Sequence, residues 1–332
     1  MSVKIEKLHC FLPDAVLTNY ELSTRFPDWS PEKIEEKIGI RTRHIAGINE
    51  TALDLAYHSA VKLFIDYPKE NIDFLLFCTQ SPDYFLPTSA CILQEKLGLR
   101  TNIGALDFNL GCSGFVYGLA LAKGLICGGM ANNVLLITAE TYSKHIHPQD
   151  RSNSSIFGDG AASAIISRSI NDNIKLFVFG TDGRGKDNLI VNHGGMRHPE
   201  SDRTNPGSTI DGILFSPDHL FMNGPEIFNF TIESVPGLVA NTLAMNHTSM
   251  DEIDFFIFHQ ANKYMLEYLR KKIKIPKEKF YINMLETGNT VSATIPIALK
   301  DSIANGLVKP GQKIMLVGFG VGYSFAAVII EL

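Results

Sequence analysis

Cys112 is the residue of this sequence whose type and setting most favour covalent chemistry. It follows a predicted strand over residues 103–108 and opens a predicted helix over residues 113–127. The unpaired N–H groups and the positive dipole end of a helix stabilise a thiolate at such a position. The small residues Gly111 and Ser113 beside it let a substrate approach closely. A thiolate placed in this way can accept an acyl group as a thioester, although a free cysteine is more often a buried structural thiol.

Two further polar residues stand at comparable places later in the chain. His259 follows the apolar run of residues 255–258, and a histidine at the carboxyl end of a buried strand lies where the active sites of α/β proteins are built. Asn289 follows Gly288 at the expected start of another helix. Taken alone, His259 is equally well explained as a hydrogen-bonded side chain at a strand end, and Asn289 as a helix N-cap.

An internal repeat relates these positions to one another. Residues 71–80 read NIDFLLFCTQ, and residues 252–260 read EIDFFIFHQ. In each half a Gly-X-small step into a helix, a glycine-rich turn and an apolar strand then follow in the same order. Two copies of one α/β unit explain this order. The duplication pairs Cys112 with Asn289 and the end of the first strand with His259, so that the three side chains could meet from distant stretches.

The remaining polar and glycine-rich motifs carry less information. Residues 157–162 and 318–322 are rich in glycine but lack the Lys-Ser/Thr pair of a phosphate-binding loop. The second stretch could present backbone N–H groups to an oxyanion. His145 and His147 form an HxH pair without nearby carboxylate or cysteine ligands, so we expect no metal site. Residues 182–218 predict a long loop, which is either a pocket wall or a solvated excursion.

The composition limits the class of protein. A chain of 332 residues that is 45% hydrophobic can bury a large core. Its net charge of -5, without a basic excess, argues against a nucleic-acid partner. No signal peptide is visible, and no run approaches the roughly 20 apolar residues of a membrane span. The five cysteines form no CxxC pair, which fits neither a disulfide framework nor a zinc site. We therefore expect a cytoplasmic protein.

At these residues the chain resembles β-ketoacyl-ACP synthase III, the condensing enzyme that initiates type II fatty-acid synthesis on acyl carrier protein (ACP). The likeness covers nearly the whole length. Its short motifs stand in order and at family-like spacing: GIRTRHI at 39–45, PTSAC at 87–91, GCSGF at 111–115, DRS at 150–152, FGDGA at 157–161, HQAN at 259–262 and GNT at 288–290.

The resemblance implies both a fold and an arrangement of catalytic groups. The fold would be a duplicated thiolase-like α/β fold, layered α-β-α-β-α with two mixed five-stranded sheets. Its halves would span residues 1–168 and 169–332. The catalytic triad would consist of Cys112, His259 and Asn289.

The resemblance also implies a reaction. Cys112 would take an acyl group from acyl-CoA or acyl-ACP, with the backbone amides of Cys112 and Val321 binding the oxyanion. His259 and Asn289 would hydrogen-bond the thioester carbonyl of malonyl-ACP and so stabilise the enolate that forms as carbon dioxide leaves. Attack on the Cys112 thioester would then yield a 3-oxoacyl-ACP. No cofactor or metal would be needed, and the enzyme would be a homodimer.

Residues outside the triad are implied by position alone. Those expected to bind substrate or CoA are Arg151, Lys33, Lys37, Gly224 and Ala261, and those expected to dock the carrier protein are Lys263, Lys271 and Lys272. Family members carry a Trp and an Arg that sandwich the CoA adenine. Lys33 and Lys37 occupy those two places here, while Trp29 stands four residues early. The donor, CoA or carrier protein, therefore stays open at this stage.

Other functions would use a similar set of residues. A papain-like cysteine hydrolase also has Cys, His and Asn in this chain order, but Cys112 lacks the aromatic residue that follows such a nucleophile. A specialised condensing-enzyme relative would pass the acyl group to another carbon, oxygen or nitrogen acceptor, in secondary metabolism or in surface-glycan or lipid synthesis. A thiolase would need a second catalytic cysteine, and none follows Cys127. A non-catalytic partner subunit would lose a triad member.

Overall fold

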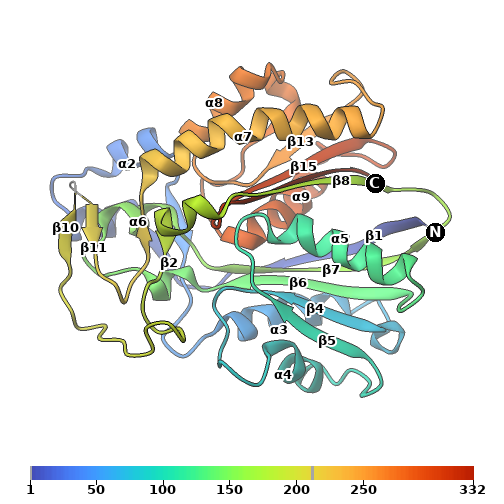
Figure 1. Ribbon diagram of the computed structural model, residues 1–332, viewed down its shortest axis with the longest axis horizontal. Coiled ribbons are helices and arrows are strands. Elements are labelled where there is room, and N and C mark those ends of the chain that lie inside the picture. The colour runs from blue at the N-terminus through green and yellow to red at the C-terminus, as the bar shows by residue number, and fades with distance from the viewer. Residues whose placement is uncertain (1, 211–212) are drawn as a thin grey trace.

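The computed structural model describes residues 2–210 and 213–332, and two five-stranded mixed sheets form its centre (Figure 1). The first sheet has the order β1-β7-β6-β4-β5, with strands β1 (Ser2–Phe11), β4 (Phe74–Cys78), β5 (Gly104–Phe108), β6 (Asn133–Glu140) and β7 (Gly160–Ser169). The second has the order β14-β13-β15-β16-β8, with strands β8 (Ile174–Thr181), β13 (Phe255–Phe258), β14 (Phe280–Tyr281), β15 (Lys313–Gly320) and β16 (Ser324–Glu331).

The two sheets repeat one topology. In the first, β4 lies between its parallel neighbours β5 and β6, and antiparallel β7 and β1 complete the sheet. In the second, β13 lies between parallel β14 and β15, and antiparallel β16 and β8 follow. This identity of order and direction confirms the predicted duplication. The connection from β7 to β8 runs from Ser169 to Ile174, so the expected boundary between residues 168 and 169 lies beside it and stays a prediction.

Helices lie in three layers around the sheets (Figure 1). Helices α5 (Gly114–Cys127) and α9 (Thr294–Ala304) lie between the sheets and contact both of them. Helices α3 (Ala52–Leu63) and α4 (Ser89–Lys96) cover the outer face of the first sheet, and α7 (Gly224–Met245) with α8 (Lys263–Ile273) covers the second. The predicted α-β-α-β-α layering is therefore confirmed. Helix α5 is apolar on nearly every side because both sheets bury it.

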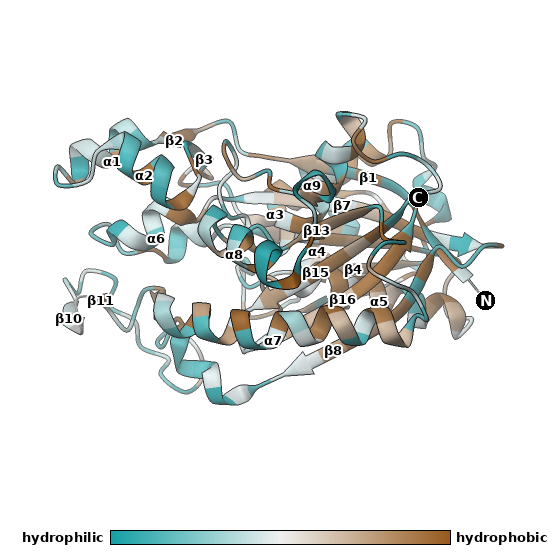
Figure 2. Cartoon of the chain, turned by 90° about the horizontal axis from the view of Figure 1, so that it is seen from above, coloured by the Kyte–Doolittle hydropathy of each residue, from teal (hydrophilic) through white to brown (hydrophobic). Residues whose placement is uncertain are grey.

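The smaller elements gather at one end of the molecule, where the chain is more hydrophilic than in the sheets (Figure 2). They are α1 (Asn19–Arg25), α2 (Pro31–Ile38), α6 (Arg151–Ile156), β2 (Val16–Thr18), β3 (Thr42–His44), β9 (Leu189–Ile190), β10 (Ser208–Ile210), β11 (Ile213–Phe215) and β12 (Phe221–Met222). Short 3-10 turns complete the chain: η1 (Lys69–Asn71), η2 (Tyr142–His145), η3 (Gly183–Asn188), η4 (Lys277–Lys279) and η5 (Val291–Ala293). None of the described helices has the length and apolar character needed to span a membrane.

Candidate active site

Cys112 lies in the turn between β5 and α5, as the sequence predicts, and its side chain is 5% exposed. The turn packs closely against β15. A Cβ atom at Gly320 would lie 2.7 Å from the Cys112 Sγ, and one at Gly318 would lie 2.7 Å from the Ser113 Cα. Because real Cβ atoms do not approach other atoms so closely, glycine at these positions of β15 is what admits the cysteine.

The ionisation of Cys112 is controlled by opposing effects. Burial raises the pKa of its thiol to about 12. The backbone N–H groups of Val321 and of Cys112 itself act in the other direction, because they hydrogen-bond the sulfur. The sequence predicts that N–H groups at a helix start stabilise the thiolate. In the structure the two groups that lower the pKa come from Cys112 itself, before α5, and from Val321, after β15, and burial outweighs them.

His259 follows β13 and is 2% exposed. Its backbone N–H donates to the carbonyl of Val317 in the neighbouring strand at 2.8 Å. Its Nδ1 lies 2.7 Å from the Thr294 Oγ1, and the Thr294 hydroxyl also lies 2.9 Å from the Val291 carbonyl oxygen. Burial lowers the pKa of His259 to about 3, so the imidazole is neutral at pH 7.

Asn289 lies just before η5 and is 4% exposed. Its backbone forms an isolated parallel bridge with Phe157, which fixes it against the first half of the chain. Its Oδ1 accepts a hydrogen bond from the Val291 N–H at 2.9 Å, while its Nδ2 makes a long contact of 3.5 Å with the Ala261 carbonyl. The side chain therefore caps a turn, as the simpler interpretation expected, and it also keeps an amide donor for a ligand.

The structure brings the segments that carry these three residues together. Cys112 belongs to a buried apolar cluster, whose other members are Tyr142, Phe157, Leu189, Leu220 and Val291. Phe157 pairs with Asn289, and Val291 follows Asn289 by two residues. His259 bonds Val317, the residue before the glycine that packs on Ser113. Segments from both halves of the chain thus lie together near the ends of β5, β13 and β15.

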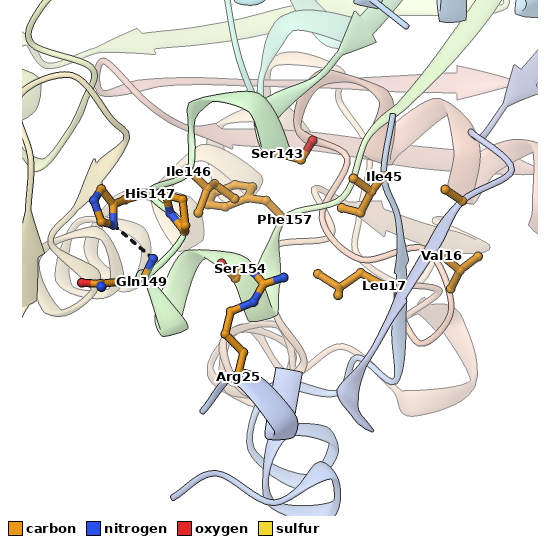
Figure 3. A pocket seen from close by; sticks show the side chains of 12 residues that line it. Val16, Leu17, Arg25, Ile45, Ser143, Ile146, His147, Gln149, Ser154 and Phe157 are labelled. Atoms are coloured by element: carbon orange, nitrogen blue, oxygen red, sulfur yellow. Dashed lines mark hydrogen bonds between the residues drawn. The ribbon is translucent and has the colours of Figure 1, made fainter. Parts of the chain in front are cut away.

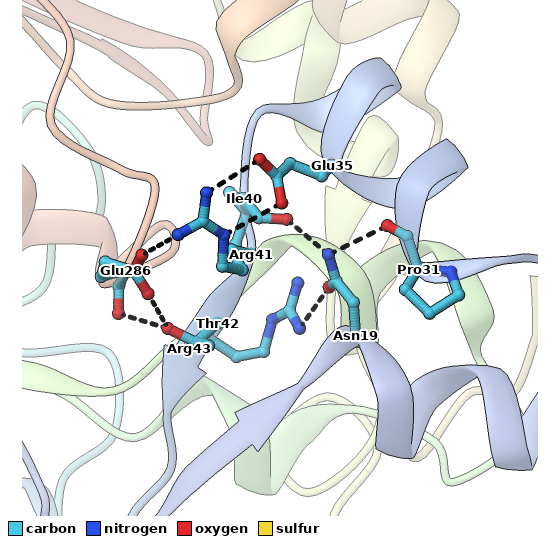
Figure 4. A network of polar contacts seen from close by, with 8 residues as sticks. All are labelled: Asn19, Pro31, Glu35, Ile40, Arg41, Thr42, Arg43 and Glu286. Carbon is cyan, nitrogen blue, oxygen red and sulfur yellow. Dashed lines mark hydrogen bonds and ion pairs between the residues drawn. The ribbon is translucent and has the colours of Figure 1, made fainter.

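A polar network fastens the loop that carries Asn289 (Figure 4). Arg41 donates to the Glu286 carboxylate at 3.1 Å, and the Thr42 hydroxyl donates to the same carboxylate at 2.8 Å. Arg43, which is fully buried, donates to the Asn19 Oδ1 at 2.9 Å. The GIRTRHI segment at residues 39–45 therefore has a structural function, since it ties the N-terminal elements to the loop just before Asn289.

A cleft of about 1250 Å³ lies between α2, α6, α7 and the start of α8. Four of the residues predicted to bind substrate or carrier line it: Lys33, Lys37, Gly224 and Lys263. Two other lining residues, Ile156 and Met222, also pack against the cluster that contains Cys112. The cleft therefore extends from a rim that carries lysines toward the cysteine.

Arg151 and Trp29 form a cation–π contact at the cleft, with the guanidinium carbon 4.9 Å from the indole centroid. Trp29 lines the cleft. The guanidinium lies over the face of the indole ring, and the outer face of such a stacked pair is a flat surface on which a purine can stack. Trp29 could not be predicted as a binding residue from its position in the sequence, because it stands outside helix α2. Its contact with Arg151 is a tertiary contact that spacing along the chain does not reveal.

Other predicted binding residues lie elsewhere. Ala261 places its carbonyl near the Asn289 amide rather than in the lining of the cleft. Lys271 and Lys272 lie in the last turn of α8, and the Lys272 ammonium donates to the Ile232 carbonyl at 2.8 Å. In this structure these two lysines are not part of the cleft lining.

A second cavity of about 730 Å³ lies beside α6 (Figure 3). Its walls are mainly apolar and include Leu17, Ile146 and Phe157, with Arg25 at one side. His147 also lines it. Within residues 2–210 and 213–332, no group of three or more His, Cys, Asp or Glu side chains is placed to hold a metal ion.

Comparison with known proteins agrees with this architecture. The family models described as 3-oxoacyl-[acyl-carrier-protein (ACP)] synthase III and as its C-terminal part match residues 106–183 and 243–332. A beta-ketoacyl-[acyl-carrier-protein] synthase III from Caldanaerobacter subterraneus is 36% identical over 324 residues, which are 97% of this chain and 95% of the relative. The crystal structure of a 3-oxoacyl-(acyl-carrier-protein) synthase III is 48% identical, covers 100% of both chains and has a TM-score of 0.98.

A second solved structure gives the same result. The 3-oxoacyl-(acyl-carrier protein) synthase from Burkholderia xenovorans LB400 is 37% identical, with a TM-score of 0.92 over 100% of this chain and 94% of the other. The likeness thus extends over both halves and over every segment that meets at Cys112. The chain belongs to the 3-oxoacyl-[acyl-carrier-protein] synthase III family of acyl-transferring condensing enzymes.

Proposed function

We propose that this enzyme loads an acyl group from acyl-CoA onto Cys112 and condenses it with malonyl-ACP to a 3-oxoacyl-ACP. The observation that carries the proposal is the meeting of the Cys112, His259 and Asn289 segments beside the inner end of the cleft. The names of the relatives support acyl carrier protein as the partner. Neither the papain-like alternative nor a specialised acceptor is favoured by these relatives.

In the loading step, the Cys112 sulfur attacks the donor thioester carbonyl. The thiol proton passes to the Nε2 of neutral His259 and then to the departing CoA thiolate, so that one carbon–sulfur bond forms as another breaks. The backbone N–H groups of Cys112 and Val321, which lower the pKa of the Cys112 thiol, stabilise the oxyanion. A donor of this type commonly contributes about 3–4 kcal/mol to transition-state stabilisation.

In the condensing step, the malonyl thioester carbonyl accepts hydrogen bonds from His259 and Asn289. These bonds stabilise the enolate that forms when the carbon–carbon bond to the carboxylate breaks and carbon dioxide leaves. The enolate carbon attacks the Cys112 thioester and expels the Cys112 sulfur. Because a hydroxyl can donate or accept, Thr294 supports both tautomers of His259 that the two steps require.

The rim of the cleft supports acyl-CoA as the donor. Trp29 and Arg151 offer a stacking surface for an adenine, and Lys33, Lys37 and Lys263 place positive charge near bound phosphates. The same lysines suit the phosphate of the carrier-protein arm. An acyl-ACP donor would use this charge without the stacking surface. Trp29 therefore separates the two donors experimentally.

We further propose a cytoplasmic homodimer that works without a cofactor. Strand β5 forms an edge of the first sheet, and its Leu106 is 39% exposed. In the segment before helix α4, which packs on β5, three large apolar side chains are strongly exposed: Tyr84, Phe85 and Leu86. A second copy of the chain would cover this surface. The free thiols of Cys10, Cys78, Cys91 and Cys112 fit a reducing compartment.

The proposal is tested by incubating the enzyme with acyl-CoA and malonyl-ACP and measuring 3-oxoacyl-ACP by mass spectrometry. We expect the product with wild type and none with Cys112→Ala. An acyl-ACP donor that outperforms every acyl-CoA would overturn the choice of donor. If neither acyl-CoA nor acyl-ACP gives the 3-oxoacyl product, the proposed reaction itself is wrong.

A further inference from the structure

Glu140 is a buried acid beside the site that the proposed chemistry does not use. It is the last residue of β6 and is 0% exposed. The Gln80 N–H donates to its two carboxyl oxygens at 3.0 and 3.2 Å, and the hydroxyls of Ser81 and Ser292 lie at 3.2 and 2.9 Å. Burying a carboxyl group costs free energy unless its hydrogen bonds are satisfied. A buried carboxyl group with this set of contacts is therefore a candidate for a specific function.

Ser292 connects Glu140 to the second half of the site. It is the middle residue of η5, with Asn289 before this turn and Thr294 after it. The Asn289 Oδ1 bonds the first N–H of the turn, and the Thr294 hydroxyl bonds both the Val291 carbonyl and the His259 ring. A displacement of η5 would therefore move Asn289 and His259 together.

Gln80 connects Glu140 to the nucleophile. A Cβ atom at Gly111 would lie 2.6 Å from the Gln80 Oε1, 2.7 Å from Val321 and 3.4 Å from Val291. The residue before Cys112 thus packs in a slot between these three side chains. Glu140 holds two walls of the slot, because it bonds the backbone of Gln80 and, through Ser292, the turn that contains Val291.

We propose that Glu140 is a positioning residue that fixes η5, and with it Asn289 and His259, against the loop that carries Cys112. The proposal rests on the proposed function, because it takes those three residues as the reacting groups. Glu140 itself touches neither substrate nor the reacting atoms in this account.

The protonation state of Glu140 gives the proposal a distinctive readout. Burial raises the pKa of Glu140 to about 8, against the hydrogen bonds from Gln80, Ser292 and Ser81 and with a contribution from the charge of Asp159. The carboxyl group is therefore mostly protonated at pH 7. As a neutral acid it can bond η5 without placing a negative charge beside the sulfur of Cys112.

Several titratable groups face Glu140 from the elements around it. They are Cys78 at the end of β4, Cys112 before α5, Tyr142 in η2, Asp159 before β7, and His145, whose ring lies 3.5 Å from the Ser81 hydroxyl. An ionised Glu140 raises the pKa of the Cys112 thiol in addition to the effect of burial. Ionisation of Glu140 at alkaline pH should therefore oppose formation of the Cys112 thiolate.

The first test separates loading from condensation. In Glu140→Ala, we expect single-turnover acylation of Cys112 to fall by a few-fold, because the displaced His259 also acts in that step. Condensation with malonyl-ACP should fall by at least about tenfold more, because it uses both displaced donors, and loss of a donor to a developing charge commonly costs about 10²–10³-fold. Glu140→Gln should restore condensation to within about threefold of wild type, since an amide can occupy the same bonds. Ser292→Ala should reproduce the defect of Glu140→Ala, and it replaces that variant should Glu140→Ala not fold.

Asp73 provides a matched control. Its carboxylate accepts the N–H groups of Asn132 and Asn133 at 2.8 and 3.1 Å and an N–H of the Arg100 guanidinium at 3.1 Å, at the opposite end of β4 and β6. Asp73→Ala removes a comparable set of bonds from the same sheet and should leave the ratio of condensation to loading unchanged. A change in that ratio equal to the change in Glu140→Ala would overturn the proposal, as would a Glu140→Gln variant as slow as Glu140→Ala.

The second test needs no acyl substrate. The rate at which iodoacetamide alkylates Cys112, followed by peptide mapping, should rise about tenfold per pH unit in Glu140→Gln between about pH 7 and 9, because the thiolate is the reactive form. Wild type should rise less steeply above pH 8. Equal slopes would overturn the proposal. Different slopes in an enzyme that forms no acyl adduct would support the placement of Glu140 and contradict the proposed function, so the two failures are distinguishable.

Discussion

Asn289→Asp should separate the two half-reactions more sharply than any other single substitution. The aspartate keeps an oxygen to accept the Val291 N–H at 2.9 Å, so η5 should remain in place. It replaces the Nδ2 donor, which otherwise makes a long contact of 3.5 Å with Ala261. The hydrogen bond to the malonyl carbonyl is then lost, together with this long contact to Ala261. Loss of one such donor commonly costs about 10²–10³-fold in rate, or roughly 3–4 kcal/mol.

We expect condensation with malonyl-ACP to fall by about 10²-fold or more in Asn289→Asp, since a carboxylate would also repel the developing enolate. Loading of Cys112 should stay within about threefold of wild type. Loading is measured by intact-mass spectrometry in a single turnover, and condensation by release of carbon dioxide. Asn289→Ala, which also loses the cap, should show a further loss of about 1 kcal/mol in the free energy of unfolding.

A matched control is Asn246→Asp. The Asn246 Oδ1 accepts the Leu176 N–H at 2.9 Å at the far end of α7, so this variant makes the same chemical change away from the site. It should leave both half-reactions unchanged. Normal condensation by Asn289→Asp, or equal losses in loading and condensation, would refute the function assigned to the Asn289 amide.

Three further predictions concern residues that support the site. Thr294→Val removes the bond to the His259 Nδ1 and should slow condensation by about tenfold in a steady-state assay, with rescue by Thr294→Ser. The folded protein keeps a proton on Glu140 up to about pH 8, whereas an unfolded glutamate loses it near 4.5. The contribution of this proton to the free energy of unfolding is fully present below pH 4.5, where both states are protonated, and it is lost as the pH rises toward 8. Relative to Glu140→Gln, the free energy of unfolding should therefore fall by about 1.4 kcal/mol per pH unit across that window in denaturant titrations. Trp29→Ala removes the partner of Arg151 and should raise the KM for acyl-CoA several-fold while kcat changes less.

Each of these predictions has a contradicting outcome. A Thr294→Ser variant as slow as Thr294→Val would show that the hydroxyl is not what supports His259. Parallel stability curves for wild type and Glu140→Gln would mean that Glu140 is not held neutral by burial. An unchanged KM for acyl-CoA in Trp29→Ala would remove the indole from the donor site.

The positions of Cys112, His259 and Asn289 at equivalent places in the two halves could be predicted because duplication leaves a pattern in the sequence. Each half repeats a strand, a Gly-X-small step and a helix, and the equivalent positions carry Cys112 and Asn289. The end of the strand that the repeat aligns carries His259. Strand-to-helix turns of this kind are determined by local residue types, which explains why their positions are visible in the sequence.

Contacts across the fold could not be predicted in the same way. Glu140 and Ser292 are 152 residues apart, and a glutamate at the end of an apolar run has no local feature that reveals its partner. The effect of burial on Cys112 depends on how closely Gly320 of β15 approaches the sulfur. A helix start is visible in the sequence, but the strand that covers it is not, so the burial that raises the pKa of the Cys112 thiol could not be predicted.

The most direct test of the account is the mass of the protein after incubation with acyl-CoA alone. We predict that wild type gains the mass of one acyl group, that peptide mapping places it on Cys112, and that Cys112→Ala gains none. His259→Ala and Asn289→Ala should still acquire the group, although His259→Ala should do so more slowly. An adduct that persists undiminished in Cys112→Ala, or no adduct on wild type with any acyl-CoA or acyl-ACP, would contradict the central claim.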